Sequence, residues 1–170
     1  MKLVIIRGLP CCGKTIICDK LQKKVSNIKI ISIDKYKTEL MNQSKDVNFE
    51  TVLAYSYDKT IEKLNDFYEK GEQIVVIEEL FCDKKLFDLI INFINNKKSI
   101  VYWFRIERDI NKLLLVEKNR TDRKIKNTKE DLINLNKDIN NLKVDNEIFI
   151  KNENIDEVVN EILNIIKWWY

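Results

Sequence analysis

GLPCCGKT, residues 8–15, stands between an apolar run, KLVIIR at 2–7, and a segment with helical periodicity, IICDKLQKKV at 16–25. The chain of 170 residues contains three glycines and one proline, and two of the glycines and the proline fall within this stretch. Glycine lets backbone N–H groups approach a ligand where a side chain would block the way. The concentration of glycine at one turn therefore indicates that the backbone here holds a ligand.

The stretch fits G-x-x-x-x-G-K-[ST], a phosphate-binding loop that joins a strand to a helix. The amino terminus of the following helix adds the positive end of its dipole to such a site. We expect Lys14 to reach the β- and γ-phosphates of ATP, and the Thr15 hydroxyl to hold the cofactor Mg²⁺. The predicted nucleotide-binding residues are Gly8, Leu9, Pro10, Cys11, Cys12, Gly13, Lys14, Thr15 and Ile16.

Two of the four cysteines lie inside this loop. Cys11 stands where many related loops have glycine, and Cys12 where they often have serine or another small residue. We interpret both as packing residues; the alternative is a redox role, because a thiol beside a helix amino terminus has some thiolate character. The chain has no histidine and no C-x-x-C pair, so we expect no zinc site.

Composition indicates one globular domain covering residues 1–170, with 45% hydrophobic and 34% charged residues. The net charge of +3 comes from 30 basic and 27 acidic residues and gives no evidence of nucleic-acid binding by itself. No window has the roughly 18 consecutive apolar residues of a membrane span. Free cysteines and no visible signal peptide predict a soluble cytoplasmic protein.

Hydrophobic periodicity predicts strands that alternate with helices. Such alternation implies parallel pairing and a three-layer α/β domain, with a sheet of about five strands covered by helices on both faces. The charged segment at about 105–130 is expected to form a helical lid. The expected strands are 2–7, 29–34, 73–80, 99–106 and 147–150, and the expected helices are 16–25, 49–68, 86–94, 132–142 and 155–168.

Asp34 ends the second expected strand, at the edge where open α/β sheets place their ligands. A carboxylate there could take the proton from an acceptor hydroxyl during phosphoryl transfer. The alternative is a helix N-cap, and the two roles can coexist. Lys37, three residues later, could hold an acceptor phosphate or the γ-phosphate.

Glu78 and Glu79 end the third expected strand at the same edge of the sheet. One of them could orient the Mg²⁺ shell through water or bind the acceptor, and Glu78 is the preferred residue. The alternative is that both are solvated loop residues.

Four arginines, a residue type that suits phosphate oxygens, fall in the segment RIERDINKLLLVEKNRTDR at 105–123. Arg120 and Arg123 lie one helical turn apart and could point the same way. We expect at least one of them to act as a catalytic cation on a lid. The alternative is a solvated stripe of a helix. The four are Arg105, Arg108, Arg120 and Arg123.

The chain resembles the P-loop kinases grouped with polynucleotide kinase and the zeta-type toxins. IIRGLPCCGKT resembles their strand and Walker A loop, IISIDKYK their D-x-x-[RK] element, VVIEEL their acid-ended strand and EKNRTDR their arginine lid. The resemblance implies that Asp34 is a general base, Lys37 an acceptor or phosphate contact, and Arg120 or Arg123 the lid arginine. Lys37 stands where the polynucleotide kinases have arginine.

The sequence therefore predicts an ATP-dependent kinase that phosphorylates a hydroxyl group, either a polynucleotide 5′-OH or a small molecule such as a nucleotide sugar. A second hypothesis is a non-catalytic nucleotide-binding module that regulates a partner. The two differ in whether phosphate is transferred to any hydroxyl. No N-K-x-D motif follows a strand, which favours ATP over GTP.

Overall fold

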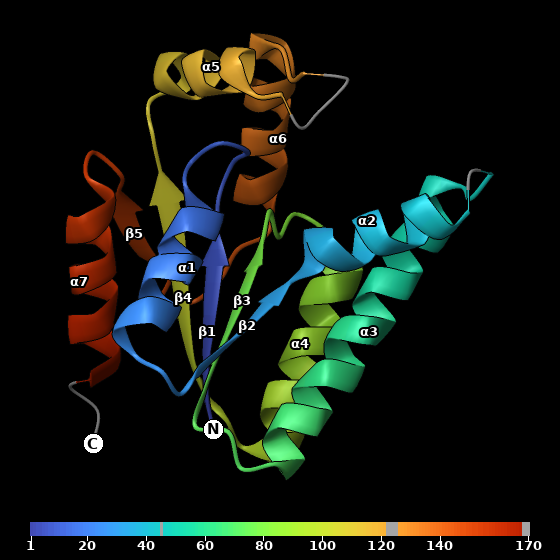
Figure 1. The fold of residues 1–170 in the computed structure, drawn as a ribbon, viewed down its shortest axis with the longest axis vertical. Helices are drawn as coiled ribbons and strands as arrows, with labels where there is room; N and C mark the ends of the chain where they lie inside the picture. The colour runs from blue at the N-terminus through green and yellow to red at the C-terminus, as the bar shows by residue number, and fades with distance from the viewer. Residues whose placement is uncertain (45, 122–125, 168–170) are drawn as a thin grey trace.

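Five parallel strands form one sheet at the centre of the protein in the computed structural model, which describes residues 1–44, 46–121 and 126–167 (Figure 1). Their order is β2-β3-β1-β4-β5, with every neighbouring pair parallel. This confirms the predicted α/β class and the five-stranded parallel sheet. The strands are β1 (Lys2–Arg7), β2 (Ile28–Ser32), β3 (Ile74–Glu79), β4 (Ile100–Glu107) and β5 (Ile148–Lys151).

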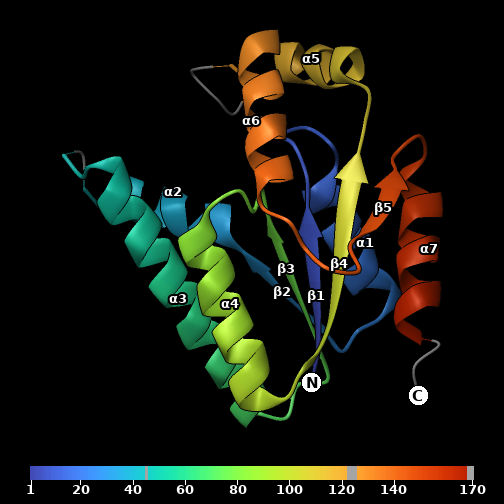
Figure 2. The ribbon, with the colours of Figure 1, turned by 180° about the vertical axis from the view of Figure 1, so that it is seen from behind.

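Helices cover both faces of the sheet, as the apolar strands require. The central residues of β1 and β3 have no solvent exposure, so both faces of these strands must be buried. Figure 1 shows α1 and α7 on one face, and Figure 2 shows α3 and α4 on the other. Their bounds are α1 (Lys14–Lys24), α3 (Phe49–Glu69), α4 (Lys84–Lys97) and α7 (Ile155–Lys167). Within the described ranges, no helix combines the length and apolar character needed to cross a bilayer.

The second strand is shorter than expected, because a helix begins inside its predicted carboxyl end. β2 stops at Ser32, and α2 (Ile33–Gln43) follows at once. Asp34 therefore lies in the first turn of α2 and is not the N-cap, a position that Ser32 occupies. Ile33, the first residue of α2, made the strand look longer because it is apolar, and it is fully buried in the core cluster with residues of β1, β3 and α3. α2 and α3 form a hairpin that projects beside the β2 edge (Figure 1).

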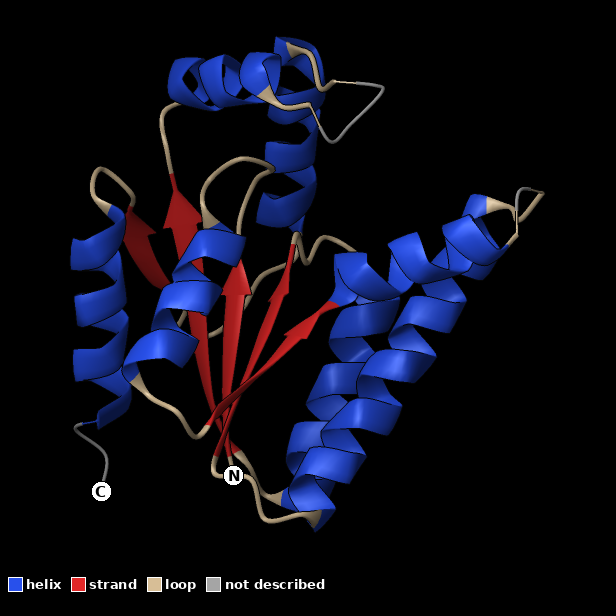
Figure 3. Ribbon diagram, in the orientation of Figure 1, coloured by secondary structure: helices blue, strands red, loops and turns tan. Residues whose placement is uncertain are grey.

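Two helices, α5 (Ile110–Asn119) and α6 (Lys129–Asn141), lie beyond the carboxyl ends of the strands, above the strand tips in Figure 3. β4 runs to Glu107, so the helical part of the predicted lid begins after residue 107 and not at residue 105. Arg105 is consequently a strand residue. Arg123, one of the two expected lid arginines, falls outside the described residues.

Two buried arginines fasten α6 to the sheet. Arg7, which ends β1, donates to the carbonyl oxygens of Ile139 (2.5 Å) and Leu142 (3.2 Å) at the end of α6. Arg105, its partner in register on β4, donates to the side chains of Asn136 and Asn140 of α6. These guanidinium groups satisfy helix oxygens and are not available to a phosphate. The predicted phosphate-directed role therefore does not apply to Arg105.

Glu147 completes this anchor, because its Oε1 lies 3.2 Å from Nε of Arg7 in a buried ion pair. Burial lowers the pKa of Arg7, and burial raises the pKa of Glu147 against the opposing charge of Arg7. Each group is therefore costly to bury without the other.

We expect Arg7→Met to destabilise the fold by roughly 3–5 kcal/mol, because it leaves Glu147 and two helix carbonyl groups buried without this partner. The double variant Arg7→Met/Glu147→Leu should recover much of that loss, since no buried charge remains. Urea denaturation measures both. Lys84→Ala, which removes an exposed ion pair with Asp88, is the control and should cost under about 1 kcal/mol. A loss for Arg7→Met no larger than that of the control would contradict the anchoring role.

Candidate active site

The loop between β1 and α1 wraps around the carboxyl end of β1 with glycine at its two tightest points. Gly8 has φ 151°, and a Cβ atom there would lie 2.5 Å from the carbonyl oxygen of Ile106 on β4. Gly13 has φ 104°, and a Cβ atom there would lie 2.7 Å from Nδ2 of Asn152. Close packing against neighbouring segments therefore requires glycine at both positions. This requirement is separate from the space that a bound ligand would need. Gly13 is the N-cap of α1 and supplies no side-chain cap to its first N–H groups.

Lys14 and Thr15 open α1 and already have oxygen partners. Nζ of Lys14 donates to the carbonyl oxygens of Gly8 (2.8 Å) and Leu9 (3.0 Å), so the ammonium group lies across the loop. Oγ1 of Thr15 donates to Oε2 of Glu78 at 2.9 Å. A hydroxyl group and a carboxylate therefore join the start of α1 to the end of β3. Both are oxygen ligands of the kind that Mg²⁺ prefers.

Glu79, the residue after Glu78, faces a different group. Its Oε2 lies 2.8 Å from Nζ of Lys37, and its Oε1 accepts the N–H of Leu80. Lys37 also contacts Oδ1 of Asp34 at 3.1 Å, so one ammonium group bridges two carboxylates. Burial lowers the pKa of Lys37, but the charges of Glu79 and Asp34 outweigh burial and raise it overall. Lys37 is therefore a fixed cation.

The lid touches the phosphate loop through Cys11, which has the left-handed φ of 64°. Its thiol donates to Oε2 of Glu117 at 2.8 Å, and Nη1 of Arg120 lies 3.7 Å from the same sulfur. Glu117, on α5 and 1% exposed, accepts through Oε1 from the backbone N–H and the side chain of Asn127. The thiol at the top of the loop is thus bonded to a buried carboxylate of the lid. Here Cys11 makes a specific contact, beyond the packing role expected of it.

A cavity of about 800 Å³ brings these groups together. Most of the predicted site residues line it, whereas the loop residues Gly8, Leu9 and Cys12 are buried and do not line it. The lining residues also include Glu79, which the sequence offered as the alternative to Glu78, and several that it did not single out for the site. The predicted ones are Pro10, Cys11, Gly13, Lys14, Thr15, Ile16, Asp34, Lys37, Glu78 and Arg120, and the others include Phe49, Glu79, Leu80, Val116, Asn127 and Leu135.

Asn152 is a supporting residue that sequence reasoning missed. It follows β5, is buried, and donates from Nδ2 to the carbonyl oxygen of Cys12 at 2.6 Å. The only signal in the sequence was a polar residue directly after a buried strand. Glu117 was missed as well, because one acid in a charged helical segment looks like a solvated residue.

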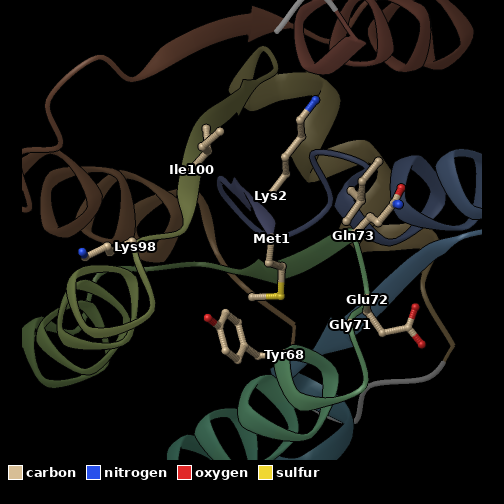
Figure 4. Close-up of a pocket in the computed structure, with 9 residues that line it drawn as sticks. Met1, Lys2, Tyr68, Gly71, Glu72, Gln73, Lys98 and Ile100 are labelled. Carbon is tan, nitrogen blue, oxygen red and sulfur yellow. The ribbon is translucent and has the colours of Figure 1, made fainter. Parts of the chain in front are cut away.

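A second hollow, of about 470 Å³, lies at the opposite end of the sheet and involves Met1, Tyr68 and Ile100. Figure 4 shows Met1 and Tyr68 lying toward one another, with the charged ends of Lys2, Lys98 and Glu72 directed away from them. It holds none of the predicted site residues. The predicted site residues lie instead around the cavity at the carboxyl ends of the strands.

Comparison with known proteins supports the same class of fold. No protein-family model and no curated protein sequence matches the chain. Among solved structures, a candidate kinase from Chloroflexus aurantiacus is 14% identical with a TM-score of 0.72, over 96% of this chain and 97% of its own. The fold is that of the P-loop kinases.

Two further structures agree. A sugar kinase from a Janibacter species is 10% identical with a TM-score of 0.69, over 98% of this chain and 95% of its own. The APS kinase of Mycobacterium tuberculosis is 11% identical with a TM-score of 0.66, over 98% of this chain and 97% of its own. Identities this low establish the fold alone. The finer grouping with polynucleotide kinases and zeta-type toxins stays a prediction.

Because Cys11 contacts the lid, we predict that its thiol has a raised pKa and loses its proton only at high pH. Burial raises the pKa of Cys11, the hydrogen bond to Glu117 raises it further, and Arg120 opposes this. Glu117→Gln removes the carboxylate charge, so the pKa should fall and alkylation by iodoacetamide should begin at lower pH. Rate–pH profiles resolved by peptide mass spectrometry measure this.

Cys82 provides an internal control for that titration. Its pKa is also raised by burial, then by Glu79, but Glu117 is not among its neighbours. The profile of Cys82 should therefore be the same in both proteins. An unchanged midpoint for Cys11 in Glu117→Gln would contradict the hydrogen bond.

Proposed function

We propose that this protein is a kinase that transfers the γ-phosphate of ATP to a hydroxyl group. One observation carries the proposal: a single cavity joins the phosphate-binding loop to a carboxylate beyond it, Asp34. A nucleotide-binding module that only senses ATP has no need of a base on the acceptor side of the loop. The kinase fold of the neighbours supports the reaction class but not the acceptor.

The nucleotide's phosphates would occupy the loop. There, Lys14 would exchange the carbonyl oxygens of Gly8 and Leu9 for the β- and γ-phosphate oxygens, which are stronger acceptors because they are charged. The first N–H groups of α1 would complete the anion site. The lid cation Arg120, beside Cys11, would balance charge on the transferred group. We propose the same role for Arg123 as an alternative.

Thr15 and Glu78 fit a magnesium site. Mg²⁺ prefers oxygen ligands, keeps several waters and is usually completed by substrate phosphates. Bound Mg²⁺ would supply positive charge to the β- and γ-phosphates. We propose Glu78, which contacts Thr15, for the metal side of the site, and Glu79, which contacts Lys37, for the acceptor side that the sequence had assigned to Glu78.

Asp34 is the proposed general base. Its side chain is 65% exposed and lines the cavity, and Lys37 contacts one of its oxygens. As the acceptor oxygen bonds to the γ-phosphorus and the bond to ADP breaks, Asp34 would receive the hydroxyl proton. Lys37, itself held by Glu79, would keep this carboxylate in place.

Lys14→Ala should remove ATP binding and transfer together, because the loop loses its only side-chain cation. Asp34→Asn should leave ATP affinity within about twofold and reduce transfer by about 10²–10⁴-fold, the usual contribution of a general base. Isothermal titration with ATP and Mg²⁺ measures binding, and release of label from [γ-³²P]ATP onto an acceptor panel measures transfer.

Matched controls are Lys20→Ala, an exposed residue of α1, and Asp88→Asn, an exposed residue of α4. Both should behave like the wild type. Binding of ATP without transfer to any hydroxyl would favour the regulatory module. Undiminished transfer by Asp34→Asn would remove Asp34 from the base role.

Glu78→Gln should raise the Mg²⁺ concentration needed for half-maximal ATP binding by about tenfold, because an outer-shell carboxylate is lost while the shape is kept. Titration of Mg²⁺ at fixed ATP measures the change. Glu62→Gln, on the exposed face of α3, is the control and should have no effect. An unaltered Mg²⁺ requirement would show that Glu78 has a structural role only.

A further inference from the structure

We infer that Arg108 binds the γ-phosphate of the nucleotide, and that it does so from the end of β4 and not from the lid helices. The inference rests on the nucleotide binding in the proposed function and names a further residue of that site. None of the roles given above uses this arginine, although it lines the same cavity as Lys14 and Thr15. It therefore offers the phosphates a cation in addition to Lys14.

The guanidinium group of Arg108 carries a shielded donor. Its Nε atom has almost no contact with solvent, and none of the described residues accepts a hydrogen bond from it. Nor does any carboxylate in the described ranges form an ion pair with this arginine. A shielded donor without an acceptor is costly, and such atoms in native proteins usually have a partner. An anion bound in the cavity would accept from this donor.

The two acids that flank Arg108 are engaged by other groups. Glu107 lies 3.8 Å from Nε of Arg105, and its carbonyl oxygen accepts an N–H from the residue after β5. Asp109 is the N-cap of α5, and its side chain accepts the first N–H groups of that helix. The chain is thus held on both sides of Arg108. A cation held in this way is preorganised for a ligand, because no segment has to move to bring it there.

Arg108 lies beside the end of the loop that holds the ammonium group of Lys14. A Cβ atom on Gly8 would lie 2.5 Å from the carbonyl oxygen of Ile106, two residues before Arg108, so the loop begins against this part of β4. Nζ of Lys14 donates to the carbonyl oxygens of Gly8 and Leu9 at that same end. Leu9 and Arg108 also line one smaller hollow, of about 410 Å³. The guanidinium and the ammonium group therefore belong to the same end of the loop.

The γ-phosphate is the group that a cation at this place would meet. Backbone N–H groups of the loop and of α1 would enclose the phosphates nearer the ribose, whereas the γ-phosphate would extend past them. Arg108 lies outside the loop, directly after β4. Lys14 and Thr15 line the larger cavity and not the smaller hollow, so we place the anion in the larger one. The planar fork of arginine matches phosphate oxygens and would balance charge on the group during transfer.

Arg108→Met tests the assignment, because it keeps much of the side-chain length and removes the charge. We expect affinity for ATP with Mg²⁺ to fall by about 10–100-fold, the usual value of hydrogen bonds to charged groups, and affinity for ADP to change by less than about twofold. Calorimetric titration with ATP, AMP-PNP and ADP measures these affinities. Arg108→Lys keeps the charge but lacks Nε and the fork, so its ATP affinity should lie nearer to that of Arg108→Met than to that of the wild type.

The thermal midpoint of the nucleotide-free protein separates ligand binding from a structural role. Removal of a donor that no described residue satisfies should leave the midpoint unchanged or raise it. Differential scanning fluorimetry measures the midpoint. Lys112→Met, which removes a partly exposed cation that pairs with Glu153 on the same side of the sheet edge, is the control and should change neither the affinities nor the midpoint appreciably.

The outcomes distinguish the inference from the proposed function. An ATP affinity of Arg108→Met equal to that of Lys112→Met would overturn the inference and leave the kinase intact. An equal loss of ATP and ADP affinity would overturn it as well, because Arg108 would then serve a phosphate that both nucleotides share, or the fold itself if the midpoint also fell. Selective loss of ATP affinity in a protein that transfers phosphate to no hydroxyl would support the inference and overturn the kinase. A wild-type protein that binds no nucleotide would overturn both.

Discussion

The pairing of β1 with β3 fixes where the charged groups of the cavity lie. In register, Ile6 pairs with Glu78 and Arg7 with Glu79, so the loop that follows β1 begins beside the two acids that end β3. The chain leaves β1 toward one edge of the sheet and leaves β3 toward the other, which opens a crevice between their carboxyl ends. Most of the predicted site residues line the cavity at that crevice.

The alternation of side chains along β3 places Glu78 and Glu79 on opposite faces of the sheet. Consecutive side chains of a strand point to opposite faces. Glu78 accordingly meets Thr15 of α1, which covers one face, and Glu79 meets Lys37 of α2, which lies toward the other. Two neighbouring carboxylates thus contact different helices while lining one cavity.

Buried charge also holds the lid in relation to the loop. Arg7 and Arg105 bind the end and the side of α6, while Glu117 of α5 accepts from Cys11. Removal of any one partner leaves a polar group in a low-dielectric environment, a cost far larger than that of a surface contact. Among the described residues, one polar attachment of the lid joins α6 to the strand ends, and a second joins α5 to the loop itself. The contact between Cys11 and Glu117 lies where the phosphates of a nucleotide would enter. Binding of a nucleotide to the loop and the position of α5 are therefore physically linked.

The strands, the helices on both faces and the phosphate loop followed from the sequence, because each depends on local periodicity or on a few adjacent residues. Asp34, Lys37 and Thr15, which line one cavity, were singled out in the same way, from short motifs at expected strand ends. Tertiary structure alone decided which acid faces Thr15 and which arginines anchor the lid. It also decided the contacts that Cys11 and Asn152 make. These are contacts between residues up to 140 positions apart, such as Asn152 with Cys12. Such contacts follow from strand order and register, which no local pattern encodes.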